Sequence, residues 1–195
     1  MNDREKEVTD ESLMQRVGAG DKPAFEILVR RRQRPVINFI FRFLQDPSEA
    51  EDLAQDVFLS IWKSAGTYRP DAKFTTWLYR IVVNRCINRK RALQIRQWFS
   101  VFRPERPEPE SKEDPVALNE GIDPMTPEDL LIQSEQEEKA RRALDALPAN
   151  QRLAILLKIY NGFSYREIAD IMNCSVSAVD SLLVRAKQNL QKKLF

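Results

Sequence analysis

The sequence predicts an all-α protein made of two small helical domains joined by a flexible acidic linker. Hydrophobic residues recur at the 3.6-residue spacing of amphipathic helices along most of the 195 residues, and 43% of the chain is hydrophobic. Only five glycines are present, and five of the eleven prolines lie between the two periodic regions, within residues 99–125. We therefore expect domains at residues 9–98 and 126–195, with the linker at 99–125.

The first domain is expected to begin with two helices. One covers residues 9–17, with Thr9 or Asp10 as its N-cap, and the next extends from Pro23 to about Leu44. The second helix carries a block of arginines in its middle, which we interpret in part as a solvated face: Arg30, Arg31, Arg32 and Arg34.

A third helix is expected over Ser48–Ser64, after a break at Asp46-Pro47. One side of this helix is broadly hydrophobic, and the other side is acidic at helical spacing. The acidic positions are Glu49, Asp52 and Asp56. Both a solvated outer face and a dock for a basic partner helix fit this stripe.

The fourth helix is expected from Phe74 to Arg91, extending toward Trp98, after a loop at Gly66–Lys73. It combines aromatic, basic and amide side chains. Melted nucleic acid needs these three groups, because charges bind phosphates, rings stack on bases and amides read base edges. Trp77 fits equally a residue of the hydrophobic core and a residue that stacks on DNA.

The charge of the chain is unevenly distributed. From Arg103 to Glu138, twelve acidic residues and three basic ones give a net charge of −9, whereas the whole chain carries +2. The remainder therefore carries +11. A basic body with an acidic middle segment indicates a nucleic-acid partner.

The second domain is expected to end in two helices with a tight break. Its earlier helices span Thr126 to about Leu147, and Pro148 to Asn161-Gly162. Ser164 and Glu167 then form a capping box, and the pattern stops at Asn173, a residue type that tolerates positive φ.

The last helix starts at Ser175 or Ser177 and carries a hydrophobic stripe to Leu194. Small polar residues on its other face suit entry into a DNA major groove. The pattern fits both a DNA-binding helix-turn-helix and a plain helical hairpin.

Several classes of site are not expected. The sequence has no histidine, so we expect no zinc site and no histidine-based catalysis. No cofactor is expected either. Cys86 and Cys174 lie far apart and suit a reducing cytoplasm rather than a disulfide framework. No segment is long and apolar enough for membrane insertion, and the polar N-terminus does not resemble a signal peptide.

Three segments in this order resemble the extracytoplasmic-function (ECF) sigma factors of bacterial RNA polymerase: Asp46–Lys63, Phe74–Asn88 and Leu147–Lys187. The resemblance covers about Ser12 to Leu194. It implies a region-two-like bundle and a region-four-like helix-turn-helix domain, and a cytoplasmic, non-enzymatic subunit. The partners it implies are core RNA polymerase, promoter DNA and an anti-sigma factor.

The resemblance also implies roles for individual residues. Those expected to bind core polymerase are Asp52, Gln55 and Asp56. Those expected at the minus-ten element are Tyr68, Lys73, Trp77, Arg80, Asn84 and Asn88. Those expected at the minus-thirty-five element are Ser175, Ser177, Asp180, Ser181 and Arg185, although Asp180 and Leu182 stand where many relatives carry a basic residue. The acidic linker is expected to thread toward the RNA path of the polymerase.

Two other functions are alternatives to this one. A stand-alone helix-turn-helix regulator would bind duplex DNA, usually as a symmetric dimer, but it gives no role to the acidic third helix or the aromatic fourth helix. An enzyme acting on nucleic acid is disfavoured, because the sequence lacks histidine, a glycine-rich phosphate loop and metal-ligand spacing.

Overall fold

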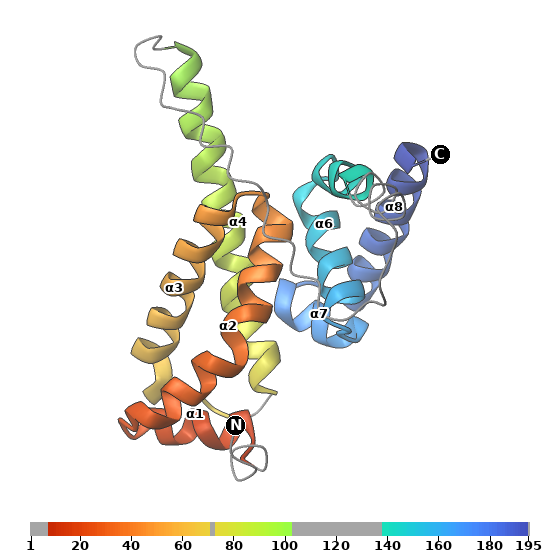
Figure 1. Cartoon of the computed structure of the whole chain (residues 1–195). Helices are drawn as coiled ribbons and strands as arrows, with labels where there is room; N and C mark the ends of the chain where they lie inside the picture. Colours follow the sequence, from red (N-terminus) through yellow and green to blue (C-terminus); the bar gives the residue numbers. More distant parts are fainter. Residues whose placement is uncertain (1–7, 71–72, 103–137, 195) are drawn as a thin grey trace, which may run out of the picture.

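The computed structural model describes residues 8–70, 73–102 and 138–194. Every regular element within these ranges is helical, which confirms the all-α prediction. The acidic segment of the linker from residue 103 onward, and the predicted helix start at Thr126, lie outside the described residues. Figure 1 shows the helices gathered in two bodies, α1 to α4 in one and α6 to α8 in the other.

The first two helices begin at side-chain caps. Helix α1 spans Asp10–Gly18, and the hydroxyl of Thr9 accepts a 3.2 Å hydrogen bond from the backbone N–H of Ser12. Helix α2 spans Lys22–Leu44, with Asp21 as its cap and a proline in its first turn. Both caps satisfy N–H groups that have no partner inside the helix.

Two arginines of the cationic block in α2 are structural. Arg31 and Arg32 bind the carboxylate of Asp10, with a 2.6 Å hydrogen bond from Arg32 Nε, and Arg31 also donates to the carbonyl of Val8. Asp10 is only 7% exposed. The interpretation of the block as a solvated face therefore fails for these two residues, because they neutralise a buried acid of α1.

The next two helices complete the first body. Helix α3 spans Pro47–Ser64, capped by Asp46, and a 3₁₀ turn follows at Ala65–Thr67. Helix α4 spans Phe74–Phe102 and so continues past the predicted end near Trp98. The carboxylate of Glu11 in α1 accepts a 2.8 Å hydrogen bond from the Phe74 N–H, which fixes the start of α4 against α1.

The second body contains the predicted helix pair. Residues 138–145 are helical, α6 spans Ala149–Ile155, and a π-helical segment Leu156–Tyr160 continues from it. Helix α7 spans Tyr165–Met172 with the predicted capping box, and Asn173 ends it with a φ of 52°. Helix α8 spans Val176–Leu194, and the hydroxyl of Ser175 rather than Ser177 caps it, by accepting from the N–H of Ala178.

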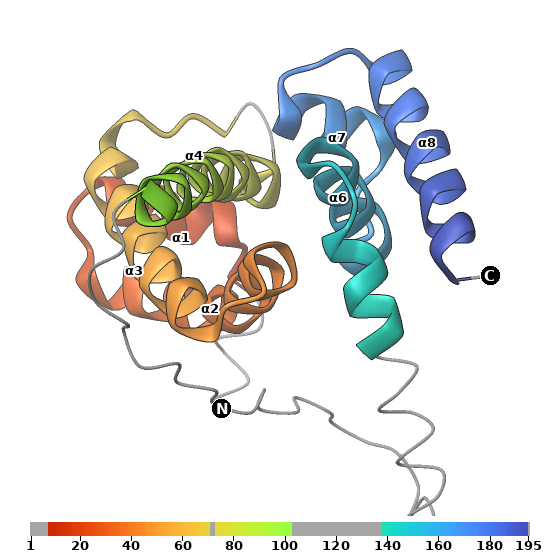
Figure 2. The same ribbon diagram turned by 90° about the horizontal axis from the view of Figure 1, so that it is seen from above.

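The two bodies pack against each other. One continuous set of buried hydrophobic side chains runs from α1–α4 into α6, α7 and α8. Figures 1 and 2 both show α7 beside the N-terminal half of α4, whereas α8 lies on the far side of the second body. Among the described residues, no helix is long and apolar enough to cross a membrane.

Candidate functional site

The acidic side of α3 is open to solvent. Asp52, Gln55 and Asp56 are all exposed and lie opposite the buried face of the helix. Arg89 reaches this side from α4, with 2.9 Å to the carboxylate of Glu49 and 3.7 Å to that of Asp56. The sequence did not single out Arg89, although a basic residue facing an acidic stripe on a neighbouring helix could have suggested it.

An aromatic cluster forms where the loop after α3 meets α4. The ring centroid of Tyr68 lies 5.2 Å from that of Trp77 and 6.1 Å from that of Phe74. Phe74 is buried, whereas Tyr68 and Trp77 are half-buried. Trp77 is therefore packed against the core along part of its ring and accessible along the rest.

The polar residues of α4 occupy two settings. Asn84 and Asn88 are exposed. Lys73 and Arg80 are exposed too, but each contacts α7: Lys73 Nζ lies 3.0 Å from the carboxylate of Glu167, and Arg80 Nε donates a 3.0 Å hydrogen bond to the carbonyl of Asp170.

The exposed face of α8 gathers the polar residues predicted for duplex DNA. All five are exposed, and they lie at the start of the helix and along its first turns: Ser175, Ser177, Asp180, Ser181 and Arg185. Ser181 donates to the carbonyl of Ser177, and Arg185 donates to the carbonyl of Ser181. The opposite face of α8 is buried at Val179, Leu183 and Ala186. The polar face of the helix therefore points toward solvent.

Lys73 and Arg80 lie in the interface between the two helical bodies, which we call the seam. Tyr79 of α4 is buried, with its ring 5.1 Å from that of Phe163 and its hydroxyl accepting a 2.6 Å hydrogen bond from Asn161 Nδ2. Burial raises the pKa of Tyr79 to about 12, although nearby arginines and the bond from Asn161 oppose this shift. This hydroxyl therefore stays protonated at neutral pH.

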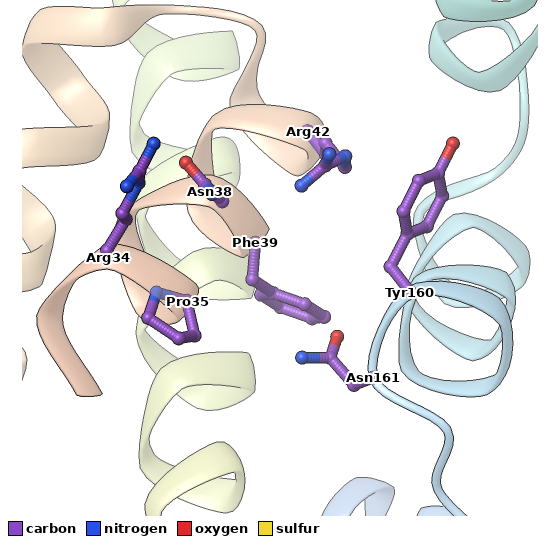
Figure 3. A pocket seen from close by; sticks show the side chains of 7 residues that line it. All are labelled: Arg34, Pro35, Asn38, Phe39, Arg42, Tyr160 and Asn161. Atoms are coloured by element: carbon purple, nitrogen blue, oxygen red, sulfur yellow. The ribbon is translucent and has the colours of Figure 1, made fainter. Parts of the chain in front are cut away.

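A pocket of about 460 Å³ opens along the same seam, between α2 and the π-helical segment. Figure 3 shows Arg34, Asn38 and Arg42 along α2 and Tyr160 and Asn161 on the other side of the pocket, with Arg42 nearest to Tyr160 among the three α2 residues. The Arg42 guanidinium lies 4.4 Å from the centre of the Tyr160 ring. Two cations line this pocket, which favours anionic groups. No sequence pattern predicts this pocket, because its two walls come from different bodies.

The described residues contain no group of three or more histidine, cysteine, aspartate or glutamate side chains that could hold a metal ion. Cys86 is buried in α4 and Cys174 is half-buried. Cys174 lies in the turn between α7 and α8.

Comparisons with known proteins identify similarity along nearly the whole chain. The family model described as "Sigma-70 region 2" matches residues 28–95, and the model described as "Sigma-70, region 4" matches residues 137–190. The RNA polymerase sigma-H factor of Pseudomonas aeruginosa is 36% identical over 185 residues, covering 95% of this chain and 93% of the relative. The ECF RNA polymerase sigma-E factor of Escherichia coli is 33% identical, covering 97% and 96%.

Solved structures share the fold. The structure of CnrH in complex with the cytosolic domain of CnrY gives a TM-score of 0.67 at 22% identity, covering 95% of this chain and 96% of that one. The sigma factor RpoE of Bartonella quintana, solved in complex with the anti-sigma factor NepR, gives a TM-score of 0.62 at 24% identity, covering 87% and 96%.

Proposed function

This chain belongs to the ECF sigma factors of bacterial RNA polymerase. We propose which of its surfaces bind core polymerase, the minus-ten element and the minus-thirty-five element during promoter-specific initiation. Members of this family are initiation factors that bind core RNA polymerase and promoter DNA, and the polymerase carries out the chemistry. In our proposal, residues 9–98 act as the region-two-like domain and residues 126–195 as the region-four-like domain.

The acidic side of α3 is proposed to dock on core polymerase. Asp52, Gln55 and Asp56 lie together, exposed, on a helix whose other side is fixed in the core. A rigid helix that presents carboxylates suits a basic partner surface, because charge complementarity steers and orients association. This exposed acidic side is the observation that carries the proposal, since neither a soluble effector domain nor a duplex-binding module needs it.

The start of α4 and the loop before it are proposed to read the minus-ten element as melted DNA. Tyr68 and Trp77 offer ring surface, Lys73 and Arg80 offer charge, and two exposed amides extend along the helix at Asn84 and Asn88. Unstacking a base costs a few kcal/mol, and stacking on a protein ring recovers about 1–3 kcal/mol per base. Contacts with phosphates supply the remainder.

Helix α8 is proposed to read the minus-thirty-five element as duplex DNA. Its exposed residues are short at the N-terminus, where the helix would enter the major groove: Ser175, Ser177, Asp180, Ser181 and Arg185. Asp180 accepts hydrogen bonds but repels phosphates, so it suits contact with cytosine rather than with the backbone.

We further propose that an anti-sigma factor controls this chain in the cytoplasm. The support is the fold shared with RpoE, which was solved in complex with the anti-sigma factor NepR. The seam between the two bodies, with its pocket lined by Arg34 and Arg42, offers an anion-binding surface for such a partner.

Co-elution with core RNA polymerase tests the proposal. The wild-type chain is expected to co-elute, and the double variant Asp52→Lys with Asp56→Lys is expected not to, because two positive charges then face the basic partner surface. Glu51→Lys is the control, since Glu51 is exposed on α3 but was not assigned to the contact. Tight duplex binding by the protein alone, without any co-elution, would instead indicate a stand-alone regulator.

A further inference from the structure

We infer that the pocket at the seam is a binding site for a small phosphate-bearing ligand, and that this ligand is a nucleotide. The site is independent of the roles proposed for α3, α4 and α8, because no residue assigned to those roles lines the pocket. A small ligand would also bind there without any partner protein, so the site does not depend on an anti-sigma factor.

Three side chains with N–H donors follow one face of α2 along the pocket. Arg34, Asn38 and Arg42 are spaced four residues apart, which brings them onto the same side of the helix. Figure 3 shows the three in a row along one wall. At a rise of 1.5 Å per residue, Arg34 and Arg42 are about 12 Å apart along the helix axis. A row of donors of this length suits a chain of phosphate groups better than a single compact anion.

The lining of the pocket is positively charged. Of the seven residues that line it, two are arginines and none is acidic. The Arg42 guanidinium lies 4.4 Å from the centre of the Tyr160 ring, and within the described ranges it donates to no carboxylate or carbonyl. Guanidinium groups form charge-assisted hydrogen bonds with phosphate oxygens. Arg42 is therefore a cation held in place by a ring, with its N–H donors left for an anionic ligand.

The other wall offers groups that suit a nucleobase. Tyr160 is 49% exposed, so part of its ring is available for contact with an aromatic base. The Oδ1 atom of Asn161 is buried and accepts no hydrogen bond within the described residues, while the Nδ2 atom donates to Tyr79. A buried acceptor without a donor costs free energy, and an N–H group of a base would satisfy it. This wall meets the row of donors at Arg42, the α2 residue nearest to Tyr160 in Figure 3.

The size of the pocket agrees with this class of ligand. Its volume of about 460 Å³ lies within the range of roughly 300–1,000 Å³ that is typical of small-molecule sites. One wall belongs to α2 and the other to the π-helical segment. A ligand that contacts both walls binds the folded chain and not the unfolded one, so it should stabilise the protein in a concentration-dependent way.

Isothermal titration calorimetry with the full chain tests the site. The probes are ATP, inorganic tripolyphosphate and adenosine, each titrated separately in magnesium-free buffer. We expect saturable binding of ATP at one site, weaker binding of tripolyphosphate because it lacks the base, and the weakest binding of adenosine because it lacks the phosphates. Tripolyphosphate that binds as tightly as ATP would keep the phosphate contacts but overturn the assignment to a nucleotide. Absence of saturable binding by both ATP and tripolyphosphate would overturn the whole inference.

Charge-removing variants locate the site. Arg34→Gln and Arg42→Gln should each weaken ATP binding by about tenfold or more, which is the loss expected for one charge-assisted hydrogen bond. Arg42→Lys keeps the charge and should weaken binding less than Arg42→Gln. Arg91→Gln is the charge-matched control, because Arg91 is exposed on α4 and does not line the pocket. An equal loss in Arg91→Gln and the two pocket variants would show non-specific attraction to a basic chain and would overturn the site.

Thermal melting separates an effect on binding from an effect on folding. Without ligand, Arg34→Gln and Arg91→Gln should melt close to the wild type, because both arginines are exposed. ATP should raise the melting temperature of the wild type and of Arg91→Gln, and it should raise that of Arg34→Gln less. The same rise in Arg34→Gln as in the wild type would contradict binding at this pocket.

Discussion

Arg152 donates a 2.8 Å hydrogen bond to the carbonyl oxygen of Phe43, across 109 residues of sequence, and its side chain is completely buried. Phe43 lies in the last turn of α2, where carbonyl groups have no partner inside the helix. Arg152 also pairs with Asp145 of its own body. One guanidinium therefore caps a helix of the first body while it is anchored in the second.

Replacing Arg152 should destabilise the protein. In Arg152→Met the side-chain volume is nearly kept, but the Phe43 carbonyl loses its donor, and we expect a loss of about 2–4 kcal/mol in the free energy of unfolding. Urea denaturation measures this loss. Arg142→Met is the control, because Arg142 is exposed and pairs only with Glu138 among the described residues. A similar urea midpoint for both variants would contradict the capping role.

The arginine block of α2 should divide into structural and dispensable members. Arg32→Gln should lower the free energy of unfolding by about 1–3 kcal/mol, because the buried carboxylate of Asp10 loses a charged donor. Arg30→Gln removes the same charge from an exposed position and should leave stability nearly unchanged. Thermal melting of the two variants measures the difference in their stability. Equal melting temperatures would show that the buried carboxylate of Asp10 does not need Arg32 as a donor.

Acid should weaken the protein partly through Glu167. Hydrogen bonds from the Ser164 backbone, then from Lys73 and the Ser164 hydroxyl, lower the pKa of Glu167 from 4.5 to about 2. Because the pKa is lower in the folded state, its contribution is fully present above pH 4.5 and is lost as the pH falls toward 2.

The urea midpoint of Glu167→Gln should therefore fall less steeply than that of the wild type between pH 4.5 and 2. Parallel curves for Glu167→Gln and the wild type would show that this carboxyl is not held ionised by the folded state.

The two cysteines should differ in reactivity. Burial raises the pKa of both thiols, and Cys86 is fully buried in α4, whereas Cys174 is half-buried in the turn before α8. Because the thiolate is the reactive form, iodoacetamide should modify Cys174 slowly in the native protein and Cys86 only after unfolding. Mass spectrometry of the peptides, with and without denaturant, measures this order. Rapid native labelling of Cys86 would contradict its burial.

The sequence by itself determined the local structure. The caps at Thr9 and Ser164, the left-handed Asn173 and the 3.6-residue stripes depend on neighbours within a few positions, and the structure confirms all of them. The same short-range information placed the acidic side of α3 and the polar face of α8, because helical periodicity decides which side chains are exposed.

Only the tertiary structure decided which distant groups meet. The buried Asp10 with its two arginines, the capping of Phe43 by Arg152, the pairing of Arg89 with Glu49 and the contact of α7 with α4 all join residues more than twenty positions apart. The local sequence around a charged residue does not show whether its side chain faces water or an ion-pair partner, because the packing of distant segments determines which groups come into contact. For this reason Lys73 and Arg80 were recognisable as candidates for DNA contact, whereas their cover by α7 was not.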